Sequence, residues 1–157
     1  MLEAAANMES ETEAIAQFRL CGTWLGVPAH QVEVVGVLGS VTPLPSVPKH
    51  IRGLTEVEGQ VFTLFDLASF LGMSDFLDDA PGPQDNSRVF VLQGGGCAAA
   101  VRVSATGRMA HLTKGELKPA DVLSNGRLTD YLTAEFDSKL GRVGVLDVAL
   151  LLESARV

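Results

Sequence analysis

The chain has 157 residues, of which 46% are hydrophobic and 20% are charged, and its formal net charge is −7. This composition is sufficient for a buried core and argues against global disorder. The length fits one domain, or two very small ones that share a core. No cluster of Lys or Arg provides the basic stripe typical of nucleic-acid binders, so DNA, RNA and anionic membranes are not expected as main partners.

The two cysteines, Cys21 and Cys97, stand alone, without a CxxC motif or a neighbouring histidine. Secreted domains of this size more often carry a fuller set of disulfides, so this usage favours a reducing compartment. The acidic start MLEAAANMESETEAIAQ lacks the basic and apolar parts of a signal peptide. No apolar run approaches the roughly 18–20 residues that span a bilayer. We therefore expect a cytoplasmic protein without direct membrane insertion.

The first half of the chain predicts short strands after a polar start. Residues 1–16 are expected to form a flexible acidic leader, with regular structure from Gln17 onward. Glycines and alternating valines over 17–39 are typical of short strands and turns. The stretch SVTPLPSVPKHIRG contains three prolines, which exclude a helix or a central strand and indicate an extended connector.

The next segments predict a strand, a short helix, a linker and a hairpin. The apolar run GQVFTLFD predicts a strand that ends at Asp66, and LASFLG predicts a short helix that Gly72 stops. The acidic, proline-containing stretch MSDFLDDAPGPQDNS is the best candidate for a linker. The three glycines 94–96 lie between the apolar runs RVFVLQ and CAAAVRV, which indicates a hairpin turn.

The end of the chain repeats the pattern of its middle. VFTLFDLASFL and RVGVLDVALLL both place an aspartate after an apolar strand, at Asp66 and Asp147, 81 residues apart. This repetition predicts two similar β-modules, at roughly 15–80 and 85–157, each of which needs the other or a partner to bury its apolar surface. Both aspartates precede a predicted helix, so capping of backbone N–H groups is their expected role.

Glu56 and Glu58 are the most conspicuous candidates for chemistry. In an extended strand they would share a face about 6.5 Å apart. Two carboxylates can act as acid and base, but a Glu-x-Glu pair on a strand is more often a solvated edge. No nucleophile or third titrating group lies nearby in the sequence.

Other sites for catalysis or cofactors are poorly supported. His30, His50 and His111 do not have the spacing of metal ligands, so no metal site is expected. QGGGC lacks the Lys and Ser/Thr of a phosphate loop. We therefore expect no cofactor and no enzymatic activity, and favour protein binding through exposed apolar strands with a polar rim.

The order and spacing of these features resemble the CheW-like domains, coupling proteins that link chemoreceptors to the histidine kinase CheA. The resemblance covers nearly everything from Gln17 onward. In the first half it rests on Leu25-Gly26-Val27, on Val32 and Val35, on VTPLPSVPKHIRGL and on Gly59-Gln60-Val61 with the strand that ends at Asp66-Leu67. In the second half it rests on VFVLQGGGCAAAVRV, MAHLTKGELKP and GRVGVLDVALLL.

The resemblance implies an all-β fold of two small five-stranded β-barrels packed together with a groove between them. Barrel 1 would span about 17–80 and barrel 2 about 85–157, in a single CheW-like domain over 17–157. A crossover of the C-terminal strand or helix of barrel 1 is compatible with this division. Short helices would follow the strands that end at Asp66 and Asp147. It also implies a non-enzymatic adaptor in a chemosensory array. Its partners would be the cytoplasmic domain of a chemoreceptor (methyl-accepting chemotaxis protein), a CheA-type histidine kinase, or both.

Several positions depart from the family pattern. The family typically has Asn-Leu-Arg-Gly where this chain has Glu56-Val57-Glu58-Gly59, so the local charge is reversed. Val34 stands where many members carry a glutamate, and Val103-Ser104 replaces the usual Val-Asp. Exchange of Arg for Glu removes a donor fork suited to carboxylates and places like charge against an acidic partner. We therefore expect altered or partial coupling.

The predicted interaction residues lie on both modules. They are Val32, Val34, Glu56, Glu58, Gly59, Val101 and Val103. For Val32, Val101 and Val103, a role in the barrel core is about equally compatible with the sequence. The alternative function is a small-molecule-binding β-barrel, or a hydrolase that uses Glu56 and Glu58. A pocket around the two carboxylates would favour that alternative, whereas a flat acidic ledge would favour docking.

Overall fold

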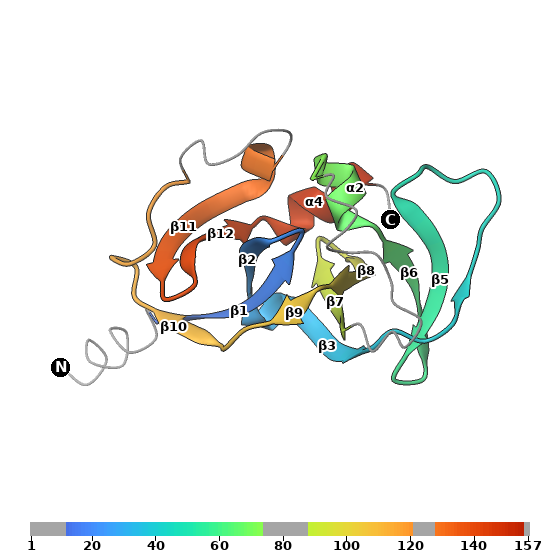
Figure 1. The fold of residues 1–157 in the computed structure, drawn as a ribbon, viewed down its shortest axis with the longest axis horizontal. Coiled ribbons are helices and arrows are strands. Elements are labelled where there is room, and N and C mark those ends of the chain that lie inside the picture. Colours follow the sequence, from blue (N-terminus) through green and yellow to red (C-terminus); the bar gives the residue numbers. More distant parts are fainter. Residues whose placement is uncertain (1–11, 74–87, 121–127, 156–157) are drawn as a thin grey trace.

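A computed structural model describes residues 12–73, 88–120 and 128–155, and it contains two β-sheets with a few short helices (Figure 1). In the first sheet, the described strands are β1 (Glu13–Leu20), β2 (Thr23–Pro28), β9 (Ala105–Thr106), β10 (Ala110–Leu112), β11 (Leu132–Ser138) and β12 (Gly141–Leu146). In the second sheet, they are β3 (Val32–Val37), β4 (Val41–Thr42), β5 (Ile51–Val57), β6 (Gln60–Phe65), β7 (Arg88–Gly94) and β8 (Cys97–Val103). Among the described residues, the helices are α2 (Leu67–Leu71) and α4 (Val148–Ala155), with 3-10 turns η1 (Ala29–Gln31) and η2 (Leu128–Tyr131).

The all-β prediction is confirmed, but the prediction that each half of the chain forms its own barrel is wrong. The first sheet runs β10-β1-β2-β12-β11, with β9 beside β1, and the second runs β3-β7-β8-β6-β5-β4. The two halves therefore exchange hairpins: β2 pairs in parallel with β12, and β6 pairs in parallel with β8. The exchange occurs because η1 follows β2 directly and carries the chain from the first sheet to the second.

The N-terminal boundary at residue 16 is also wrong. β1 begins at Glu13, and within it Ile15 and Ala16 are buried, because both side chains belong to core clusters. The stretch predicted as a linker falls almost entirely at residues 74–87, which lie outside the described residues.

The local predictions around the turns and the first helix are confirmed. β6 leads to Asp66, α2 follows at once, and Gly72 ends the helix with a left-handed φ of 71°. Gly95 and Gly96 join β7 to β8 with φ values of 61° and 82°. These conformations are open to glycine at little cost, which explains the glycine run at this hairpin.

The largest core cluster lies between the two sheets and beneath both helices. It combines Phe18 of β1 with Phe90 of β7, whose ring centroids are 5.2 Å apart, and it includes Leu71 of α2 and Leu151 of α4. Two smaller clusters fill the inner faces of the first and the second sheet. Because most of the buried apolar surface is shared, neither sheet could keep this core without the other. Among the described residues, the helices are all too short to cross a lipid bilayer.

Candidate protein-interaction surface

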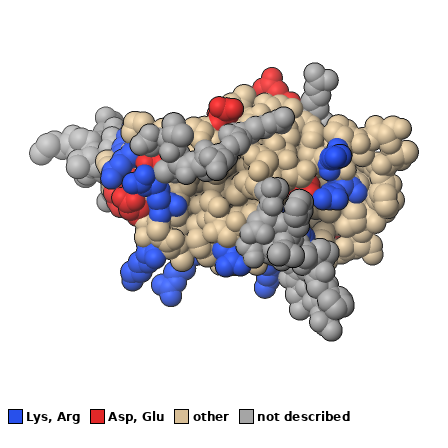
Figure 2. Space-filling view, turned by 45° about the horizontal axis from the view of Figure 1, so that its top comes forward, with Lys and Arg blue, Asp and Glu red and all other residues tan. Residues whose placement is uncertain are grey.

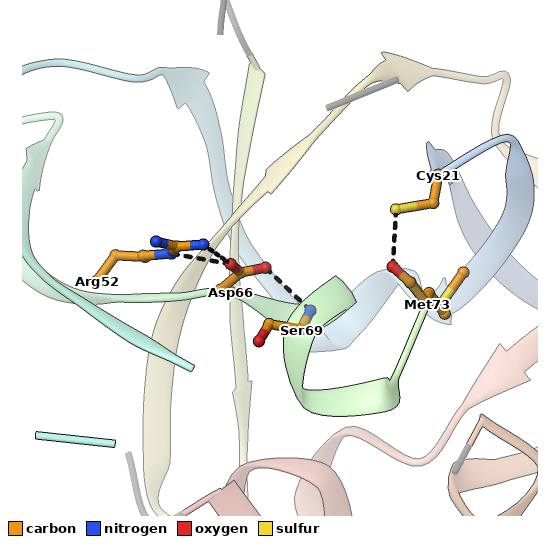
Figure 3. Close-up of polar contacts among 5 residues, drawn as sticks. All are labelled: Cys21, Arg52, Asp66, Ser69 and Met73. Carbon is orange, nitrogen blue, oxygen red and sulfur yellow. Dashed lines mark hydrogen bonds and ion pairs between the residues drawn. The ribbon is translucent and has the colours of Figure 1, made fainter. Parts of the chain in front are cut away.

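Asp66 fixes the junction between β6 and α2 (Figure 3). Its backbone N–H donates to the carbonyl of His50 at 2.7 Å, and its Oδ1 accepts the N–H of Ser69 at 3.1 Å. Its Oδ2 accepts two bonds from the guanidinium of Arg52, from Nε at 2.8 Å and from Nη2 at 2.5 Å. The predicted capping role of Asp66 is thereby confirmed.

Asp147 repeats this arrangement at the junction between β12 and α4. Its N–H donates to the carbonyl of Tyr131 at 2.7 Å, and its Oδ1 accepts the N–H of Leu150 at 3.2 Å. The sequence repeat is therefore a structural repeat, in which a strand and the following helix are connected in the same way twice. Both aspartates have structural roles at their strand–helix junctions.

Glu58 and Gly59 form the turn of the β5–β6 hairpin. Val57 pairs with Gln60, and the two residues between them have φ values of 51° and 79°. Two consecutive residues with positive φ form the tight turn that matches the twist of antiparallel strands. The prediction that Glu56 and Glu58 stand side by side on one strand is therefore wrong, because β5 ends at Val57. Both glutamates are exposed, as expected for a ledge rather than a pocket.

Val32 and Val34 lie half-buried on β3. Val32 packs against the core between the sheets, whereas Val34 packs against the inner cluster of the second sheet. An irregularity in the pairing of β3 with β7 separates them, so two residues of the same strand can face different clusters. Neither presents a fully exposed side chain to a partner.

Val101 and Val103 are not interaction residues. They retain only 0% and 2% of their accessible surface and belong to the large core cluster. β8 lies between β7 and β6, and its apolar face is covered by the rest of the fold. The core reading of these valines is correct, and the prediction that they contact a partner is wrong.

The three most exposed valines among the described residues were not predicted as interaction residues. Val35 and Val37 on β3 are 44% and 49% exposed, and Val61 on β6 is 63% exposed. Strand alternation could have identified them, since an inward Val34 turns Val35 outward, and Val61 is paired with Glu56 across the hairpin.

The alternative function has little geometric support. A shallow hollow of about 450 Å³ lies where η1 approaches the β7–β8 turn, and it is lined by His30, Gln31, Gln93, Gly94, Gly96, Cys97 and Ala98. Glu56 and Glu58 do not line it. In the part of the chain that the structure describes, no group of three acidic, His or Cys side chains could hold a metal ion.

The thiol of Cys21 donates to the carbonyl of Met73 at 3.3 Å, and this hydrogen bond connects the β1–β2 turn to the end of α2 (Figure 3).

Figure 2 shows how the charged side chains are distributed on one face of the molecule. On the face seen in Figure 2, uncharged residues cover most of the described surface, and Lys and Arg lie in separate small groups. No continuous basic stripe crosses this face.

The protein consists of two packed β-sheets, and its candidate functional site is the exposed surface at the β5–β6 hairpin rather than a pocket. The family model of the CheW-like domain matches residues 15–156, so the chain belongs to the CheW-like family. Protein FrzA from Myxococcus xanthus is 28% identical over 153 residues, covering 97% of this chain and 92% of that protein. The scaffolding protein TtCheW from Thermoanaerobacter tengcongensis has the same fold, with a TM-score of 0.75 and 19% identity over 90% of this chain and 92% of that one. The resemblance seen in the sequence is confirmed, and with it the class of chemotaxis adaptors.

Proposed function

We propose that this protein is a cytoplasmic, non-enzymatic adaptor that binds chemoreceptor cytoplasmic tips, a CheA-type histidine kinase, or both. Family membership supports the adaptor role. The exposed position of Glu56 and Glu58, away from the hollow at the β7–β8 turn, supports docking over acid–base chemistry. The protein would then act by holding partners together.

The observation that carries the proposal is Glu58 at the tip of the β5–β6 hairpin. It stands where the family motif has its arginine, and the turn presents its side chain to solvent. An adaptor with Glu here offers an acceptor and a negative charge where the family offers five N–H donors. Like charges placed together across an interface weaken association and slow the encounter. Coupling to a kinase with the usual acidic acceptor would therefore be altered or partial.

As part of the same proposal, each of the two sheets closes into a small β-barrel. Each described sheet has five longer strands and one strand of two residues. In the first sheet, Lys118 exchanges two backbone hydrogen bonds of 2.9 Å with Glu135 of β11, which links the segment after β10 to the opposite edge. In the second sheet, Gly36 of β3 lies against Val57 of β5. These contacts support closure of both sheets.

The decisive experiment is calorimetric titration of the full chain with two partners from the same organism. One partner is the receptor cytoplasmic tip and the other is the regulatory domain of the kinase. Binding of at least one is expected. If neither binds at concentrations where an Asn-Leu-Arg-Gly adaptor binds its own partners, the coupling role is wrong.

A variant separates the role of Glu58 from the adaptor role itself. Glu58→Arg should bind the regulatory domain of a kinase whose own adaptor carries Asn-Leu-Arg-Gly about tenfold more tightly than the unchanged chain does. Glu153→Arg, on the exposed face of α4, makes the same charge change elsewhere and should give no gain. No gain from Glu58→Arg would assign the altered coupling to Val34 or to residues 85–157.

A further inference from the structure

The outer face of the second sheet carries an apolar surface that the core does not use. Val35, Val37 and Val61, here called the valine face, are each 44% exposed or more. Their strand neighbours Val34, Leu38 and Phe62 point inward and pack on the inner cluster of the sheet. Since side chains alternate along a strand, the three valines point outward.

The end of β3 lies close to the end of β5, which is paired with β6. A Cβ placed at Gly36 would lie 2.8 Å from Cγ1 of Val57, and one at Gly39 would lie 3.7 Å from the carbonyl oxygen of Glu56. The end of β3 therefore lies against the end of β5, on the side away from β7. On the other side of β5, Glu56 is paired directly with Val61 of β6.

Two carboxylates lie within and beside this apolar surface. Glu56 lies on β5, paired with Val61 of β6, and Glu58 lies in the adjacent turn. Neither carboxylate has a hydrogen bond or an ion pair among the described residues. Arg88 of β7 is paired opposite Val37 of β3.

We infer that the valine face with Glu56 and Glu58 docks a protein surface on which apolar side chains alternate with Lys or Arg. The inference rests on the proposed function and adds the chemistry of the partner. Exposed apolar surface favours burial by a partner. The two carboxylates, which have no partner among the described residues, favour Lys or Arg on the docked surface.

The test is an NMR titration of the full, ¹⁵N-labelled chain with two synthetic amphipathic helices. Both probes have the same leucine stripe; one has Lys beside the stripe and the other has Glu. The Lys probe should shift the amide signals of 34–38 and 56–61, and it should bind about three- to tenfold more tightly than the Glu probe at low salt. The preference should shrink as salt screens the exposed charges.

Variants assign the preference to the residues. Glu56→Gln with Glu58→Gln should abolish the preference for the Lys probe, while Glu153→Gln on α4 should retain it. Val61→Ser should weaken binding of both probes. Equal binding of the two probes, or shifts confined to another face, would overturn the inference. The probes contain no chemotaxis sequence, so failure of receptor and kinase binding would reject the proposed function while a Lys preference at this face still stood.

Discussion

Asp66 and Asp147 provide a matched pair for measuring what the strand–helix junctions contribute to stability. Asp66→Ala removes the N-cap bond to Ser69 and the ion pair with Arg52, whereas Asp147→Ala removes only the bond to Leu150. A lost N-cap costs about 1 kcal/mol. The Arg52 side chain is 60% exposed, so its ion pair adds only about 0.5 kcal/mol after screening. Asp66→Ala should therefore destabilise by about 1.5 kcal/mol and Asp147→Ala by about 1 kcal/mol.

Urea unfolding followed by circular dichroism measures both changes, and Asp66→Asn separates the two contributions. Asparagine caps a helix about as well as aspartate, so Asp66→Asn should cost only the ion pair, about 0.5 kcal/mol, and less at high salt. For a chain of this length, Asp66→Ala should lower Tm by about 3–6 °C. The reasoning is refuted if Asp66→Asn costs as much as Asp66→Ala, or if Asp147→Ala costs clearly more than Asp66→Ala.

Three further changes test the packing and the turn. Gly53→Ala should destabilise by about 2 kcal/mol or more in urea unfolding, since φ is 138° and the new Cβ would collide with the carbonyl oxygen of Thr42; a neutral result would show that β4 is not held there. Leu151→Ala, at a fully buried position of α4, should cost about 2–5 kcal/mol, and a cost below 1 kcal/mol would place α4 outside the shared core. Glu58→Gly should raise stability by about 0.5–1 kcal/mol in thermal unfolding because glycine tolerates the positive φ, and a loss of stability would argue against this turn conformation.

The local features were predictable because they depend on neighbouring residues. An aspartate after an apolar strand and before a short apolar stretch predicts a capped helix, and both instances have that geometry. Gly72 and the glycines 94–96 predicted a helix end and a turn for the same reason. Glu56 and Glu58 were predicted to be exposed, since unpaired charges are costly to bury, and both are exposed.

The pairing of distant strands was not predictable in the same way. Nothing in the sequence of β2 identifies β12, more than a hundred residues later, as its parallel neighbour. The assignment of 17–80 and 85–157 to separate barrels followed the order of the chain, and the hairpin exchange overrides that order. Val101 and Val103 were misassigned for a related reason. The sequence of an apolar strand is the same whether its apolar face packs against a partner protein or against the other sheet of the same chain.

Glu58 lies at a position where its charge can affect the choice of partner without affecting the stability of the fold. Glu58 is exposed in a two-residue turn, and its carboxylate has no bond to any described part of the fold, so a change of its charge has little to disturb. Surface substitutions of this kind usually alter stability by no more than about 0.5 kcal/mol. Glu58→Arg should therefore leave Tm almost unchanged while it changes which partner binds, and thermal unfolding beside calorimetry measures both. A large loss of Tm would mean that Glu58 serves the fold, and the charge reversal would then say nothing about the partner.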